Sequence, residues 1–131
     1  MAKTPCKSCP YRQDAPSGLW HEREYEKLPG YDGDIPDQLE NGGFALFDCH
    51  QHDGRLCAGW VACHGAHNLL ALRLHGGSVH EDVWTYQSPV PVFASGQEAC
   101  DHGKRDIDRP GPKARAMIHR LLRAARKRGY G

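Results

Sequence analysis

The sequence FDCHQHDGRLCAGW at residues 47–60 gives the strongest indication of how this chain folds, because it carries Cys49 and Cys57 with seven residues between them. A second stretch, PCKSCPYR at residues 5–12, carries Cys6 and Cys9 with two residues between them. A Cys-x-x-Cys turn directs two thiolates at one ion, and a pair from a distant stretch can complete the tetrahedron that zinc prefers. The four cysteines therefore predict one metal site that joins the two stretches.

Two further side chains are alternative ligands. His50 follows Cys49 directly, and Cys63 comes six residues after Cys57. If both cysteines lie on one helix, a six-residue step turns their thiols in different directions, which argues against both binding the same ion. A hydrogen bond to thiolate sulfur is a second role for His50 and for His52. The sixth cysteine, at position 100, is expected to be a free thiol.

Zinc is the favoured ion, because four thiolates form a closed structural zinc site. An iron–sulfur cluster is the alternative, since four thiolates also hold a [4Fe–4S] cluster and the Cys9-Pro10 step occurs in ferredoxin-type sites. The alternative would make the protein a redox sensor or an enzyme that uses the same cysteines. The intervals after Cys9 and Cys49 match no standard zinc finger.

The composition predicts a small fold with many turns. The chain has 131 residues, of which 39% are hydrophobic, 15 are glycine and 9 are proline, and the mean hydropathy is -0.69. We expect a loop-rich α+β domain organised around the four-cysteine metal site, with a C-terminal amphipathic helix. Residues 1–103 would form the metal-binding domain, and residues 104–131 a basic C-terminal helix packed on it.

Local patterns predict the elements between these landmarks. Ser17 is a candidate cap for the first helix. The expected elements are a short helix over 19–28, an exposed acidic connection over 31–43, a strand over 44–47, one long helix over 56–74 and extended structure over 83–93.

The C-terminal helix has the clearest pattern. Pro112 suits its first turn, Gly129 offers a stop, and apolar residues recur at helical spacing from Ala114 to Ala125. Residues 1–103 carry 7 basic and 14 acidic groups, whereas residues 104–131 carry 10 basic and 2 acidic groups. Such a tail can contact nucleic-acid phosphates, an acidic protein partner or the chain's own acidic body, or simply remain solvated. The candidate contact residues are Arg115, Arg120, Arg123, Arg126 and Lys127.

The sequence favours a binding or regulatory module over an enzyme. It has no Gly-x-Ser-x-Gly, phosphate-loop or His-Glu-x-x-His motif, and the histidines from His64 to His80 are expected to be packed or on the surface. A signal peptide is absent from the first residues, and the longest strongly apolar run, Leu69–Leu72, is too short for a membrane span. We therefore expect a cytoplasmic protein whose reduced thiols bind metal.

Four segments resemble a small family of uncharacterised proteins from actinobacteria and their phages. In that family a Cys-x-x-Cys-Pro-Trp/Tyr-Arg start is followed by Phe-x-Cys-His and Cys-x-Gly segments. The resemblance covers about the first 75 residues and implies an actinobacterial or phage origin, with Cys6, Cys9, Cys49 and Cys57 as the functional set and His50 close by. It implies no activity and no role for Cys63, Cys100 or the basic tail. The segments are CKSCPYR at 6–12, DAPSG at 14–18, FDCH at 47–50 and CAGW at 57–60.

Overall fold

Short helices and one hairpin make up the fold in the computed structural model, which describes residues 1–129, apart from the side chain of Asp53. The α-helices are α1 (Glu22–Glu26), α2 (Ile35–Glu40), α3 (Ala58–His64), α4 (Leu70–His75), α5 (Gly96–Lys104) and α6 (Pro112–Lys127). Four 3₁₀ helices connect them, η1 (Leu28–Tyr31), η2 (Ala66–Asn68), η3 (Gly76–Ser78) and η4 (Glu81–Thr85). Strands β1 (Asp48–Cys49) and β2 (His52–Leu56) pair antiparallel. The protein is thus small and mostly helical, with a two-stranded hairpin and a C-terminal helix.

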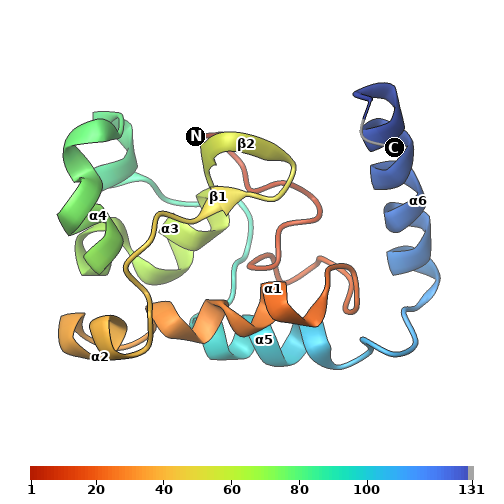
Figure 1. The fold of residues 1–131 in the computed structure, drawn as a ribbon, viewed down its shortest axis with the longest axis horizontal. Coiled ribbons are helices and arrows are strands. Elements are labelled where there is room, and N and C mark those ends of the chain that lie inside the picture. The colour runs from red at the N-terminus through yellow and green to blue at the C-terminus, as the bar shows by residue number, and fades with distance from the viewer. Residues whose placement is uncertain (130–131) are drawn as a thin grey trace.

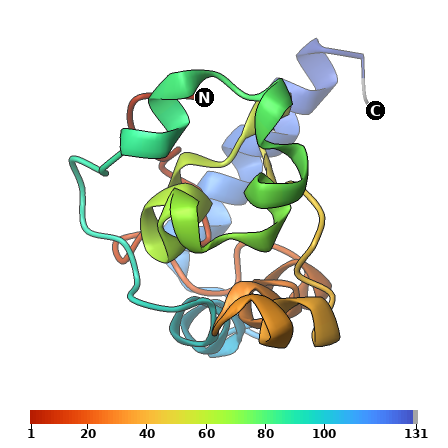
Figure 2. The same cartoon turned by 90° about the vertical axis from the view of Figure 1, so that its left-hand side faces the viewer.

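Helices α1 and α5 lie side by side along one edge of the molecule, and the hairpin lies on the opposite side of the body (Figure 1). Tyr25 of α1 faces Gly103 of α5, where a side chain on residue 103 would overlap the Tyr25 ring. The Tyr25 hydroxyl accepts hydrogen bonds from the backbone N–H groups of Leu19 and Trp20, both at 3.1 Å. This contact connects the N-terminal loop to the helical edge. In the perpendicular view α3 and α4 lie in front of α6, which stands at the far end of the molecule (Figure 2).

Aromatic rings form the centre of the core. Tyr11 and Trp60 are completely buried, and Phe47 is 6% exposed. The rings of Tyr11 and Phe47 meet edge to face with centroids 5.9 Å apart, and Tyr31 meets Trp60 in the same way at 5.4 Å. Such aromatic pairs stabilise the fold by more than the burial of their apolar area alone. They fix the loop that follows Cys9 and the start of α3 in one body.

The long helix expected over 56–74 is interrupted. Gly65 has a φ of +79°, a backbone conformation that ends α3 and redirects the chain into η2 before α4 begins. The apolar periodicity of this region was real, because residues of both helices enter the core. The prediction of one continuous helix was wrong, because the apolar pattern continues across Gly65 although the helix does not.

The acidic connection expected over 31–43 is largely exposed, as predicted, but it also contains α2, which was not predicted. Asp34 and Asp37 form a reciprocal capping box at the start of α2. The strand expected over 44–47 was also misplaced. Strand pairing begins one residue later, with Asp48 opposite Leu56 and Cys49 opposite His52.

The remaining predictions were right only in part. The first helix is shorter than expected and is capped by His21, while the Ser17 hydroxyl donates to Gly103 O at 3.2 Å. Residues 83–93 contain the end of η4 and one isolated bridge between Arg12 and Val92. Helix α5, with the buried Cys100, was not predicted.

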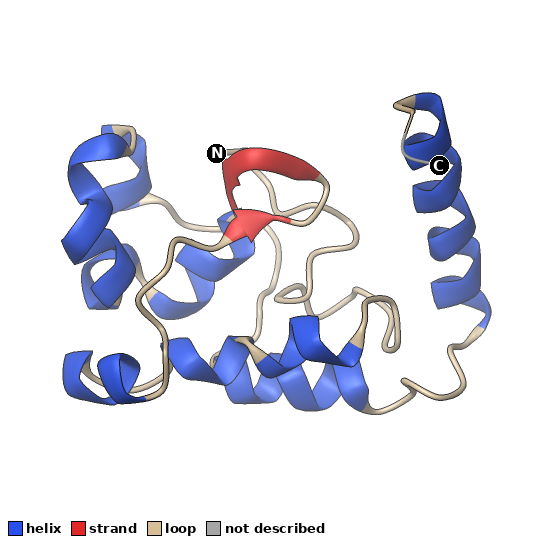
Figure 3. Cartoon of the chain, viewed as in Figure 1, coloured by secondary structure: helices blue, strands red, loops and turns tan. Residues whose placement is uncertain are grey.

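The C-terminal helix is confirmed as α6, followed by Gly129 at a φ of +84°. It stands at one end of the molecule, reached through a loop from α5 (Figure 3). Ala114 near its start is 1% exposed, whereas Leu122 is 48% exposed. The apolar stripe of α6 is therefore covered at its first turn and partly uncovered farther along. None of the helices in the described part of the chain is long and apolar enough to cross a membrane.

Candidate metal centre

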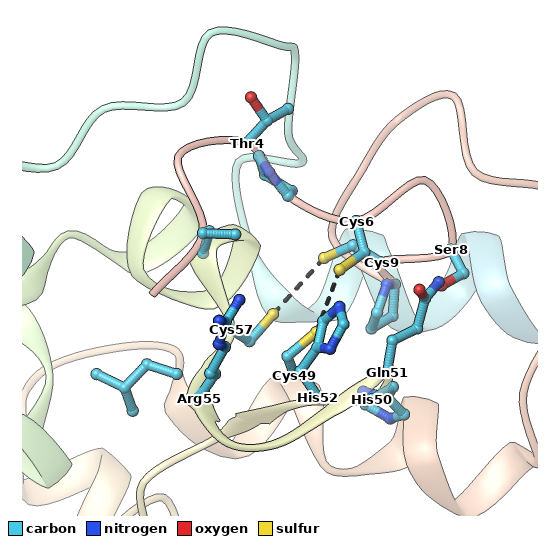
Figure 4. Close-up of a pocket in the computed structure, with 15 residues that line it drawn as sticks. Thr4, Cys6, Ser8, Cys9, Cys49, His50, Gln51, His52, Arg55 and Cys57 are labelled. Atoms are coloured by element: carbon cyan, nitrogen blue, oxygen red, sulfur yellow. Dashed lines mark hydrogen bonds between the residues drawn. The ribbon is translucent and has the colours of Figure 1, made fainter. Parts of the chain in front are cut away.

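Three separate segments bring the four predicted cysteines to one place. Cys6 and Cys9 lie in a tight turn in which Cys9 N–H donates to Cys6 O at 2.8 Å. Cys49 ends β1, and Cys57 is the residue from which α3 starts. Backbone N–H of Cys57 donates to Phe47 O at 2.9 Å, which ties the two ends of the hairpin together. In Figure 4 the four sulfur atoms lie at the centre of one group of side chains.

The thiols form two close pairs. The sulfurs of Cys6 and Cys49 are 3.2 Å apart, and those of Cys9 and Cys57 are 3.6 Å apart. All four thiols are free of disulfide bonds. Two ligands of a tetrahedral zinc ion lie about 3.8 Å apart when each Zn–S bond is about 2.3 Å, so the second pair already has nearly that spacing. Among the described residues, no group of three or more His, Cys, Asp or Glu side chains meets the full geometric requirement for holding a metal ion.

Backbone N–H groups surround the buried thiol of Cys9. The hydrogen bond with the Cys57 thiol lowers the pKa of Cys9 most, and hydrogen bonds from the N–H groups of Tyr11, Arg12 and Gly59 add to this effect because they favour the charged form. Gly59 permits the close approach, because a Cβ at this position would lie 2.5 Å from the Cys9 sulfur. The Cys-Ala-Gly segment thus supplies one thiol and leaves room for another.

The thiols also influence one another across the two pairs. Burial and the nearby Cys49 raise the pKa of Cys6 to about 12, and the charge of Cys9 adds to the effect. The pKa of Cys57 is raised well above its usual value, first by its hydrogen bond with Cys9 and then by burial. Four thiolates this close repel one another, and a bound divalent cation would offset that repulsion.

The cavity beside the sulfurs is small. It offers about 10 Å³ to the centre of a water-sized sphere, which is room for one water molecule or one ion. All four cysteines line it, together with His50, His52 and Arg55. Four thiols are the donor set of a structural zinc site and the cavity has room for one ion, but the described side chains as arranged do not meet the geometric requirement for holding a metal. A [4Fe–4S] cluster fits less well, because each of its irons takes its own thiolate and the four sulfurs then stand farther apart than ligands of one ion.

Of the two alternative ligands, His50 lines the same cavity as the four cysteines, and Cys63 does not. Nε2 of His50 is 3.2 Å from a carboxylate oxygen of Glu24, and the imidazole ring contacts the tilted ring of Trp20 with centroids 4.7 Å apart. Nδ1 of His50 is buried without a hydrogen-bond partner. Cys63 lines a different cavity, next to Asp32, and burial raises its pKa to about 12. The structure therefore separates Cys63 from the four cysteines, whereas His50 lies beside them.

The predicted contact residues of the tail are all on the surface. Arg115, Arg120, Arg123, Arg126 and Lys127 are exposed. Within residues 1–129, and leaving the Asp53 side chain aside, no acidic group forms an ion pair with a cation of α6. The possibility that these cations pair with the chain's own acidic body thus has no support from the described side chains.

Sequence reasoning missed a buried polar chain next to the core. The Tyr11 hydroxyl is 3.1 Å from Nε2 of His64, and Nδ1 of His64 is 3.5 Å from Asp32. Asp32 in turn accepts the N–H groups of Gly96 and Gln97 at the start of α5. No spacing rule connects these residues, because their contacts depend on the packing of four separate segments.

Fold and site together define a small, mostly helical protein in which four cysteines from a turn and a hairpin gather beside an aromatic core. Residues 1–126 match a family of unknown function, DUF6283, and the chain belongs to this family. No curated protein and no solved structure matches the chain. The family match confirms the expectation of an uncharacterised family, while the actinobacterial or phage origin stays a prediction.

Proposed function

We propose that this protein binds one zinc ion through Cys6, Cys9, Cys49 and Cys57, and that the zinc-bound fold is a binding module that contacts nucleic acid through α6. The observation that carries the metal assignment is the meeting of the four thiols, with sulfur pairs at 3.2 and 3.6 Å beside a cavity of ionic size. Zinc would act structurally here, because all four ligand positions are taken by protein thiolates. The proposal includes a regulatory role for this module in the cytoplasm.

Chemical analysis of protein purified without oxygen tests the metal. We expect a colourless protein with one zinc per chain. Iron and acid-labile sulfide in equal amounts, with visible absorption, would contradict zinc and support the iron–sulfur alternative, in which the protein is a redox sensor or enzyme.

Cysteine variants test the ligand set. Cys6→Ser and Cys57→Ser should each lose stoichiometric zinc, because three thiolates hold the ion less tightly than four. Cys63→Ser and Cys100→Ser are matched controls that remove a thiol outside the group, and His50→Gln removes the other alternative ligand. Full zinc content in Cys6→Ser or Cys57→Ser would remove that residue from the site.

The nucleic-acid part of the proposal rests on the charges of α6. Its cations are exposed, and the described acidic side chains leave them unpaired. A row of unpaired cations binds phosphates with an affinity that falls as salt rises. An acidic protein partner is the competing explanation for the same row.

A salt series with the zinc-loaded full chain tests this part. We expect binding to short DNA and RNA oligonucleotides that weakens steadily between 50 and 200 mM salt, with a slope of roughly one unit per phosphate contact. Changing Arg115, Arg120, Arg123 and Arg126 together to Gln should reduce the slope. No detectable binding of either nucleic acid at low salt would refute this part and leave the zinc proposal standing.

A further inference from the structure

A groove runs between α6 and the body of the protein, next to the cysteine group. Its volume is ≈ 660 Å³. Ile118, Leu121 and Ala125 line it from α6, while Trp20 and His52 line it from the N-terminal loop and the hairpin. The groove exists because α6 is buried at Ala114 but leaves the body farther along.

The charged side chains that line the groove are basic. Arg55 stands on the hairpin side and Arg128 at the far end, where its guanidinium donates to Gln51 O at 3.3 Å. No acidic side chain lines the groove among the residues whose side chains are described. Across α6, Arg120, Arg123 and Arg126 line a second hollow of ≈ 530 Å³. Positive charge therefore continues from the groove along the outer side of the helix.

Flat rings form part of the wall opposite α6. The Trp20 ring contacts His50 with centroids 4.7 Å apart and the ring planes tilted by 43°, and its Nε1 donates to Ser8 O at 2.8 Å, which fixes the orientation of the indole. The exposed His52 lies beside it on the same wall. Aromatic faces next to a row of cations are the combination by which proteins bind unpaired bases.

We propose that this groove is a binding site for single-stranded nucleic acid. This inference rests on the proposed function and adds to it the location of the binding site and a preference for single strands. Bases lie against Trp20 and His52, the sugars contact the aliphatic side of α6, and Arg55 and Arg128 bind phosphates. A duplex does not fit this arrangement, because its bases are already stacked inside it. An acidic peptide would use the ends of the groove, but it would leave the row of cations outside α6 without a function.

Binding assays compare two surface positions with matched controls. The probes are fluorescein-labelled 12-nucleotide oligo-dT and a 12-base-pair duplex, measured by anisotropy with zinc-loaded full-length protein. Leu122→Asp places a negative charge at the groove and Arg128→Glu reverses one of its cations. Leu74→Asp and Arg73→Glu make the same changes on the exposed face of α4. We expect single-strand affinity at least about tenfold weaker in each α6 variant and within about twofold of wild type in each α4 variant.

Tryptophan fluorescence gives a second measurement. Stacking of a base on Trp20 should quench its emission, so oligo-dT should quench wild type and Trp84→Phe but not Trp20→Phe. A melting temperature close to that of wild type shows that each variant is folded.

Each result bears on the two proposals differently. Equal affinity for duplex and single strand without Trp20 quenching would overturn the groove while supporting nucleic-acid binding by the outer side of α6. Unchanged single-strand affinity in both α6 variants would also overturn the groove and support binding by the outer side of α6. An acidic peptide that binds the protein more tightly than oligo-dT and displaces it would overturn the proposal that the groove is a nucleic-acid site. Absence of any nucleic-acid binding would overturn both.

Discussion

Gly59 decides how closely the hairpin and the N-terminal turn can approach. A Cβ at this position would lie 2.5 Å from the Cys9 sulfur and 2.8 Å from Tyr11 Cβ. Because both neighbours are buried and neither can move without shifting the aromatic core, Gly59→Ala should destabilise the fold by about 1–3 kcal/mol and accelerate zinc loss to a chelator. Gly77→Ala is the control, since nothing lies within 4 Å of an added Cβ there. Equal melting temperatures for the two variants would show that the fold accommodates a Cβ next to Cys9 without loss of stability.

His64 should make stability depend on pH. Burial lowers its pKa from 6.5 to about 4, although the nearby Asp32 works in the opposite direction. Because the folded pKa lies below the unfolded one, protonation favours the unfolded chain. The stability that depends on neutral His64 is therefore fully present above about pH 6.5. As the pH falls toward 4, up to about 3 kcal/mol of this stability is lost.

Urea unfolding of wild type and His64→Gln at pH 7.5 and pH 5 isolates this contribution. The variant should lose less stability than wild type over this interval, since the thiols and carboxylates titrate in both proteins. His75→Gln replaces an exposed histidine and should behave like wild type. Identical pH dependence in all three proteins would assign the acid sensitivity to other groups.

At the level of elements, α2 and α4 are connected by one buried side chain. Gln38 is completely buried, donates to Asn68 O at 2.7 Å and accepts from Leu70 N–H at 2.9 Å. Gln38→Leu leaves both backbone groups without a partner inside the protein, and we expect a loss of about 2–4 kcal/mol in urea unfolding. Gln97→Leu, at an exposed position of α5, should change stability little. A stability loss in Gln38→Leu no larger than in Gln97→Leu would mean that water replaces the lost hydrogen bonds.

The elements also show which parts of the fold the sequence could predict. Helix α6 was predicted because its apolar residues are large and periodic. The gathering of the four cysteines was predicted because the spacing of Cys6 and Cys9 is typical of a turn that binds metal, and a second pair of cysteines can complete such a site. Helix α5 had no such signal, since its buried face consists of Gly96, Ala99, Cys100 and Gly103. Small residues at helical spacing allow η1 and α1 to approach closely, but they carry little hydrophobic periodicity. The grouping of four thiols could be expected from sequence, whereas their orientation around Gly59 could not.

At the scale of the whole molecule, the cysteine group and the hydrophobic core are parts of one structure. Cys9 and Cys57 belong to the same buried cluster as Tyr11 and Trp60. A metal bound there would connect the N-terminal turn, the hairpin and α3, and its binding free energy would add to the stability of the fold. A chain with this much turn and loop would gain stability from such a link.

The melting temperature should therefore depend on free zinc. A ligand that binds only the folded chain stabilises it by about 2.7 kcal/mol at a free concentration of about 100 times its Kd. In metal-buffered solutions the melting temperature should rise with free zinc and not with magnesium, because hard cations prefer oxygen ligands. Cys57→Ser should lose this dependence, and Cys63→Ser should keep it. A melting temperature of wild type that is independent of free zinc, with the metal shown to be absent after chelation, would mean that the aromatic core folds without the site and that the thiols serve another purpose.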